Sequence, residues 1–194
     1  MKTLFIDTST VNLIVGFSDN EKNVYLDIQI GKNNHSDHLL NSIKKGLSEN
    51  NLSVKDFDRI IVGIGPGAYT GLRVSLTVAK MFSWTLNIPM YTISSLDVFV
   101  TGLNTDGIYL IHTKAKKDHV YAKVISYINN EYKTLREEEF MEYSKFLEIS
   151  KEYDYKEILD EEKYYFNHIN INEKLLTKVT DVTFIEPNYL RGEM

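Results

Sequence analysis

Cysteine is absent from the 194-residue sequence, which excludes disulfide bonds, thiolate metal sites and a cysteine nucleophile. No segment approaches the roughly 18 uncharged apolar residues that a transmembrane helix needs. In the opening MKTLFIDTST, Asp7 comes too early for the apolar core of a signal peptide. These absences predict a cytoplasmic protein that has no membrane partner.

Basic residues are also in short supply, because 22 lysines and arginines face 27 aspartates and glutamates, for a net charge of −5. A nucleic-acid-binding protein typically carries a broad basic surface that neutralises phosphates. We therefore expect any contact with nucleic acid to be indirect, through a partner. One local run of lysines is more typical of a solvated surface than of a nucleic-acid site: Lys114, Lys116, Lys117 and Lys123.

The apolar residues, 43% of the chain, follow a regular order of short segments. Continuous or alternating apolar runs predict strands, and one-sided stripes predict helices. The first half thus predicts the order βββαβαβα, with strands at 2–7, 12–18, 23–30, 58–65 and 89–94 and helices at 35–50, 71–87 and from 95. The second half repeats the pattern weakly, with strands at 109–115, 120–128 and 132–137 and mixed short pieces over 137–166. This predicts an α/β fold of two βββαβα-type subdomains, residues 1–103 and a shortened copy over 104–194.

A glycine-rich turn lies in VGIGPGAYTGLRVSLTVAK, between a buried strand and a long helix. The turn residues are Gly63, Gly65, Pro66, Gly67 and Gly71. A Walker A loop is excluded because no Lys-Ser or Lys-Thr pair follows. The spacing fits a loose dinucleotide fingerprint, yet no acid follows before Asp97, and Pro66 lacks an N–H donor. The pattern predicts a structural strand-to-helix turn.

The helix after this turn is apolar around more than half of its circumference. Leu72 and Leu76 fall on one side and Val74 and Val78 on another. A helix lying on one sheet needs only one apolar stripe, so the second face predicts a protein–protein interface. Small residues would let a partner helix approach that face, and the polar arc is narrow. The small residues are Ser75, Ala79 and Ser83, and the polar arc is Arg73, Thr77 and Lys80. The alternative is a helix buried within its own domain.

The hairpin FIDTSTVNLIVGF carries the other candidate chemistry, because an apolar strand ends there at Asp7. The turn after Asp7 consists of Thr8, Ser9 and Thr10. Carboxylate and hydroxyl oxygens suit Mg²⁺, and sugar kinases, Hsp70 and actin-like ATPases use such a hairpin to hold phosphate and magnesium. The same residues form turns by local hydrogen bonds. After Gly107 the only glycine is Gly192, so the glycine-rich adenosine loop of such an ATPase is missing. We expect no independent ATP hydrolysis; the alternative is an ATPase or small-molecule kinase that uses Asp7.

Two histidines at the start of the first helix, His35 and His38, stand three positions apart. A zinc-peptidase helix needs His-Glu-x-x-His, with its histidines four apart, and that motif is absent. We expect no metal site, and zinc-dependent peptidase activity remains as a minor alternative.

GIGPGAYTGLR, residues 63–73, resembles the GPGSFTGLR signature of the TsaB (YeaZ) family of bacterial tRNA-modification proteins. IDTST from Ile6, HSDHLL from His35, ISSLDVF from Ile93 and PNYLR from Pro187 support the resemblance. It is dense over residues 1–103 and sparse afterwards. The chain departs from the family at one position, because it has Lys114-Ala115-Lys116 where the family typically reads Asp-Ala-Arg. A lysine replaces the aspartate, so no role of that carboxylate carries over.

The resemblance implies an actin-like ATPase (ASKHA) fold without catalysis of its own, hence a protein that is not itself an enzyme. Such proteins pair with a catalytic paralogue, TsaD, which transfers threonylcarbamoyl to adenosine 37 of tRNAs reading ANN codons, and the ATPase TsaE joins them. No cofactor of its own is implied. ATP or ADP would bind only at a complex interface, with contributions from Asp7, Thr8, Ser9 and Thr10.

The family's pairing surface is built from the first two helices, which agrees with the second apolar face found on the helix at 71–87. A homodimer through the same surface is compatible with the sequence. The predicted partner-binding residues are His35, His38, Leu39, Ser42, Leu72, Arg73, Ser75, Leu76, Ala79, Lys80 and Ser83.

Overall fold

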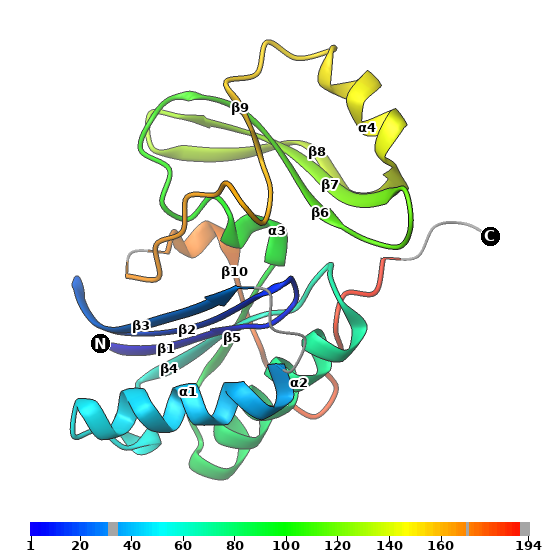
Figure 1. Cartoon of the computed structure of the whole chain (residues 1–194). Helices are drawn as coiled ribbons and strands as arrows, with labels where there is room; N and C mark the ends of the chain where they lie inside the picture. The colour runs from blue at the N-terminus through cyan, green and yellow to red at the C-terminus, as the bar shows by residue number, and fades with distance from the viewer. Residues whose placement is uncertain (31–34, 170, 191–194) are drawn as a thin grey trace.

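The computed structural model describes residues 1–30, 35–169 and 171–190. The chain forms two β-sheets and several helices that pack against them (Figure 1). The first sheet has the order β10-β5-β4-β1-β2-β3, and the second has the order β8-β7-β6-β9. Helices α1 (His35–Glu49) and α2 (Tyr69–Leu86) cover the face of the first sheet that points away from the second (Figure 1). The predicted α/β class is confirmed.

The first sheet is built mainly from the N-terminal half. Its first three strands are β1 (Lys2–Asp7), β2 (Asn12–Asp19) and β3 (Lys22–Ile30), which pair antiparallel in sequence order. Strands β4 (Arg59–Gly63) and β5 (Met90–Ile93) continue it in parallel on the other side of β1. Every residue of β4 is buried, as expected for a strand covered on both faces. The predicted order βββαβαβα is therefore observed.

Two shorter elements complete this half. A 3₁₀ turn, η1 (Val54–Asp56), precedes β4, and α3 (Ser95–Val98) follows β5. The predicted helix from residue 95 is only one turn long; Ser94 caps it by accepting a hydrogen bond from the Leu96 N–H. Asn87 caps the C-terminal end of α2, and its φ of 56° is the left-handed conformation that often terminates helices.

The second sheet contains the three strands predicted for the second half. They are β6 (Gly107–Lys114), β7 (His119–Ile128) and β8 (Glu131–Glu142). Strand β8 extends five residues beyond the predicted end at 137, because it stays paired with β7 as far as Glu142. Helix α4 (Tyr143–Ser150) and strand β9 (Glu157–Leu159), which is parallel to β6, follow.

The C-terminal segment returns to the first half. After the 3₁₀ turn η2 (Glu173–Leu175), strand β10 (Leu176–Lys178) pairs antiparallel with β5. Farther on, the Asn188 N–H donates to the carbonyl of Ile64. Residues 176–190 thus contact the N-terminal sheet and α2, while the subdomain division at residue 103 stays a prediction.

A buried charge cluster joins the two halves. Lys123 of β7 places its Nζ 2.7 and 2.8 Å from the two carboxylate oxygens of Asp97 in α3. The same ammonium lies 3.6 Å from Oε1 of Glu138 in β8. Glu138 also accepts hydrogen bonds from the Ser94 hydroxyl and from Nδ2 of Asn188, at 3.0 Å for the latter. Lys123 therefore lies in the interior and is not part of a solvated lysine surface.

Removing the lysine tests this junction. Lys123→Met is expected to lower the free energy of unfolding by about 3–5 kcal/mol at pH 7, because two buried carboxylates lose their counter-charge. Urea titration of purified protein measures the change. Lys133→Met, an exposed lysine on β8, is the matched control and is expected to stay within about 0.5 kcal/mol of the wild type. Equal stability of the two variants would contradict the assigned role of Lys123.

Candidate functional site: the glycine turn and the helix pair

The β1–β2 hairpin is pressed against the start of α2. A Cβ on Gly71 would lie 1.9 Å from the carbonyl oxygen of Thr8, and one on Gly67 would lie 2.3 Å from that of Ser9. The Ala68 N–H donates to the Ser9 carbonyl at 2.6 Å, and the Thr8 hydroxyl donates to the Gly71 carbonyl at 2.6 Å. These two glycines are needed because any side chain there would separate the two backbones.

The other glycines of the turn hold it to neighbouring elements. Gly65 has a φ of 105°, which favours glycine, and its peptide bond to Pro66 is cis. Its N–H donates to the Ser95 hydroxyl at 3.0 Å, and its carbonyl accepts from the Ser95 N–H at 2.8 Å. A Cβ on Gly63 would lie 2.4 Å from Cγ of Asp7. The turn therefore fixes the direction in which α2 leaves the sheet.

Asp7 is turned into the protein interior. Its side chain is 3% exposed, lies against Gly63, and accepts a hydrogen bond from the Ser9 N–H at 2.8 Å. Burial raises the pKa of Asp7 to about 6, and the hydrogen bond from the Ser9 N–H only partly offsets that rise. Asp7 is not among the residues that line the neighbouring cleft.

That cleft, of about 190 Å³, lies between the hairpin, α1 and the second sheet. Ser9 and Thr10 line it, whereas the Thr8 hydroxyl is already engaged by Gly71. Nε2 of His35 lies 3.0 Å from the Thr10 carbonyl. The buried Ser9 Oγ and His35 Nδ1 have no hydrogen-bond partner among the described residues. The cleft thus receives only two of the four residues predicted to contribute to an interface nucleotide site.

The far wall of the cleft comes from the second half. Lys114, at the end of β6, lines it beside Thr113 and Glu161. A carboxylate oxygen of Glu161 accepts from the Thr113 hydroxyl and from the Lys114 N–H, at 2.8 Å for the latter. The lysine that departs from the family pattern therefore faces the polar hairpin.

Most of the predicted partner-binding residues on α1 and α2 are interior residues of this chain. Ala79 and Ser75 are 0% exposed, and the Ser42 hydroxyl donates to Asp27 Oδ2 at 2.6 Å. The buried members of the predicted set are Leu39, Ser42, Leu72, Ser75, Leu76, Ala79 and Ser83. The small residues therefore pack within the chain and form no open face, and their contribution to partner binding stays a prediction.

The second apolar face of α2 is present, but large side chains form it. Trp84 is 73% exposed, and Met81 and Tyr69 are exposed as well. On α1, Leu40 is 48% exposed, and a groove of about 480 Å³ separates it from Val74 of α2. Trp84, Leu40 and Tyr69 are not among the residues predicted for the interface, although Trp84 continues the helical row of Thr77 and Met81.

Two residues of the polar arc of α2, Arg73 and Lys80, contact the C-terminal segment, whereas Thr77 lines the α1–α2 groove. Nε of Arg73 donates to the Tyr189 hydroxyl at 2.9 Å, and the guanidinium lies 4.1 Å from the ring centroid of Tyr69. Nζ of Lys80 donates to the carbonyls of Thr183 and Ile185 at 3.0 and 3.2 Å. Arg73 and Lys80, predicted to bind a partner, thus already have partners within the chain.

The two histidines of α1 have separate surroundings. His35 contacts the hairpin at Thr10, whereas His38 lies half-buried one turn along the helix. Within the described residues, no three acidic or histidine side chains are grouped closely enough to hold a metal. Among the described helices, none combines the length and apolar character needed to cross a membrane.

Comparison with known proteins assigns the chain to a family. The family model described as TsaD, tRNA N6-adenosine threonylcarbamoyltransferase, matches residues 29–187. The Bacillus subtilis tRNA threonylcarbamoyladenosine biosynthesis protein TsaB is 30% identical over 155 residues, which are 79% of this chain and 68% of that protein. The chain belongs to the TsaB (YeaZ) family.

The fold of this chain is similar to two solved structures of other proteins. YeaZ from Pseudomonas aeruginosa superposes with a TM-score of 0.64 and 21% identity, covering 73% of this chain and 67% of that one. A protein described as uncharacterized, with similarity to peptidase YeaZ from Pseudomonas aeruginosa, gives a TM-score of 0.78 at 18% identity, covering 98% and 99%. The predicted actin-like α/β fold is confirmed.

The burial of Asp7 predicts a pH-dependent stability. The folded pKa of about 6 exceeds the ordinary value of 3.8, so the folded TsaB-family chain holds this proton more tightly than the unfolded chain. That stabilisation is complete below pH 3.8 and is lost as the pH rises through 6. Asp7→Asn mimics the neutral acid and is expected to add up to about 3 kcal/mol at pH 7 and almost nothing at pH 4.

Urea unfolding of wild type and Asp7→Asn across pH 4–7 measures this difference. Asp154→Asn, at an exposed position, is the control and is expected to leave the pH profile unchanged. A difference between Asp7→Asn and wild type that does not vary with pH would refute the assignment.

Proposed function

We propose that this chain is a non-catalytic subunit in the biosynthesis of threonylcarbamoyladenosine in tRNA and pairs with a TsaD-type catalytic paralogue. The single observation that carries the pairing is the exposed apolar face of α1 and α2, formed by Leu40, Tyr69, Met81 and Trp84. Such a face on a helix that already covers its own sheet indicates a protein partner. The name of the Bacillus subtilis relative supports the pathway.

The position of Asp7 supports the non-catalytic role. Magnesium-dependent phosphoryl transfer needs carboxylate and hydroxyl oxygens that reach the metal and the nucleotide phosphates. Here Asp7 is buried against Gly63, and the Thr8 hydroxyl is bound to Gly71. An ATPase or small-molecule kinase using Asp7, the second candidate, would require the hairpin to withdraw from the glycine turn.

The remaining details follow the family resemblance. The partner would transfer threonylcarbamoyl to adenosine 37 of tRNAs reading ANN codons, and a TsaE-type ATPase would join the complex. This chain would have no cofactor of its own and would contact tRNA through the complex. ATP or ADP would bind only at an interface, where Ser9 and Thr10 reach the cleft. Without its partner, the same helix face would support a homodimer.

Pairing is tested at an exposed position of the face. Leu40→Asp is expected to weaken association with TsaD at least 30-fold, or about 2 kcal/mol, because it places a charge in an apolar contact. Calorimetric titration of the purified variant with TsaD measures the affinity. Leu135→Asp is the matched control, since Leu135 is 37% exposed, on β8. Ala79 is unsuitable, because a charge at a fully buried site would unfold the chain. Wild-type affinity in a folded Leu40→Asp protein would refute the proposed surface.

Nucleotide titration separates the two candidate functions. The isolated chain is expected to show no magnesium-dependent heat with ATP and no ATP hydrolysis, while titration with TsaD shows association. Magnesium-dependent ATP binding that disappears in Asp7→Ala would establish the ATPase or kinase instead. Asp154→Ala controls for loss of a carboxylate at an unrelated exposed site.

A further inference from the structure

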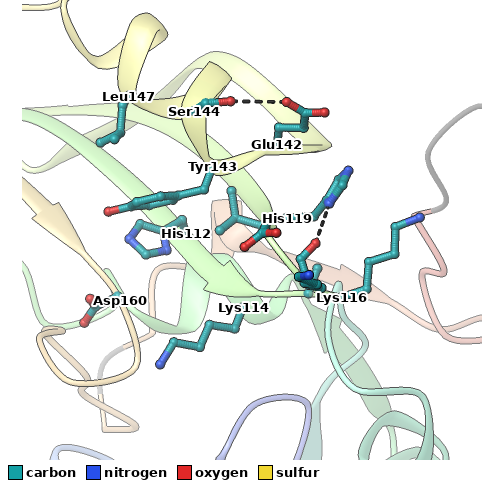
Figure 2. Close-up of a pocket in the computed structure, with 13 residues that line it drawn as sticks. His112, Lys114, Lys116, His119, Glu142, Tyr143, Ser144, Leu147 and Asp160 are labelled. Carbon is teal, nitrogen blue, oxygen red and sulfur yellow. Dashed lines mark hydrogen bonds between the residues drawn. The ribbon is translucent and has the colours of Figure 1, made fainter.

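A pocket of about 810 Å³ lies in the second half, between the turn joining β6 to β7 and the start of α4 (Figure 2). This volume is in the range of small-molecule sites. Tyr143 and Leu147 present exposed apolar surface from α4, and the Tyr143 ring lies beside His112 of β6 (Figure 2). One wall of the pocket is therefore aromatic and apolar.

His112 is the feature that points to a ligand. Its side chain lines the pocket yet is 8% exposed, and its Nδ1 has no hydrogen-bond partner among the described residues. The ring packs edge-on to Tyr143 and Phe146, with centroids 5.6 and 4.9 Å away. Burial lowers the pKa of His112, so the neutral ring offers one donor and one acceptor. Buried polar atoms are normally satisfied, so a group that enters the pocket can supply the missing bond.

Charged side chains surround the aromatic wall. Lys114, Lys116 and Lys117 line the pocket, and the Lys116 ammonium lies 5.2 Å from the ring centroid of Phe140. Three carboxylates also line it: Asp118, Glu142 and Asp160. Asp160 is partly occupied by the N–H groups of Glu162 and Lys163. Because three lysines face three carboxylates, the lining has no net charge, which disfavours a polyphosphate.

We propose that this pocket binds one nucleotide unit, with the base against Tyr143 and His112 and the phosphate near Lys117. Stacking on an exposed aromatic ring tolerates any base, and the neutral imidazole can bond to the edge of a heteroaromatic base. The nucleotide has two sources, a free nucleoside monophosphate or an unpaired nucleotide of an RNA. The pocket shares no residue with the α1–α2 groove, so the proposal is independent of pairing with TsaD.

The test is calorimetric titration of the isolated full chain, without magnesium, with AMP, adenosine, ribose 5-phosphate and a short single-stranded RNA. AMP is expected to bind, and adenosine and ribose 5-phosphate are each expected to bind at least tenfold more weakly. RNA binding at least tenfold tighter than AMP identifies an RNA nucleotide as the source; comparable affinities identify a free nucleotide. Because magnesium and TsaD are absent, failure here leaves the proposed pairing unaffected.

Variants locate the binding. Tyr143→Ala, Lys117→Glu and His112→Phe are each expected to reduce AMP affinity at least tenfold. Tyr155→Ala and Lys133→Glu are the controls, because both side chains are exposed in the second half and neither lines the pocket. Circular dichroism verifies that each variant is folded. Absence of AMP and RNA binding by the wild type, or binding that survives Tyr143→Ala and Lys117→Glu, overturns the proposal.

Discussion

The contact between the β1–β2 hairpin and the glycine turn is the constraint on which the rest of the structure depends. Two hydrogen bonds of 2.6 Å join Thr8 to Gly71 and Ala68 to Ser9, across backbones that touch directly. Because these bonds hold the first turn of α2, they set where that helix begins and how it crosses the sheet. They also place the polar turn after Asp7 at the cleft. One local approach of two backbones therefore positions both the helix face and the hairpin.

The C-terminal segment determines which side of α2 stays open. It lies along the polar arc, where Lys80 donates to two of its carbonyls and Arg73 to Tyr189. The buried stripe of α2 faces the sheet and α1, so the remaining surface is the row that ends at Trp84. The exposed hydrogen bond of Arg73 to Tyr189 contributes little energy by itself, but it engages the guanidinium within the chain.

The sequence predicted the fold well because each element has its own periodicity. The strands of the first half and the helices α1 and α2 follow from local apolar patterns. The site was harder, because a helical wheel shows two apolar faces of α2 but not which neighbour covers each. For that reason the fully buried Ala79 was predicted at the interface and the exposed Trp84 was not. Lys123 was predicted to lie on a solvated surface, because its partner Asp97 comes 26 residues earlier and only the tertiary fold brings them together.

Lys114 lines two spaces, the cleft beside the β1–β2 hairpin and the pocket of the second half. A carboxylate here, as in the pattern Asp-Ala-Arg, would repel an anion from either space, whereas an ammonium attracts one. The Lys114 N–H is held by Glu161, which fixes the backbone and leaves the side chain exposed. Lysine in place of the family's acid at position 114 therefore changes the charge that lines both the cleft and the pocket. In the pocket of the second half, which shares no residue with the α1–α2 groove, this charge favours phosphate without affecting the proposed pairing surface; the cleft adjoins that groove at Ser36 and Thr70.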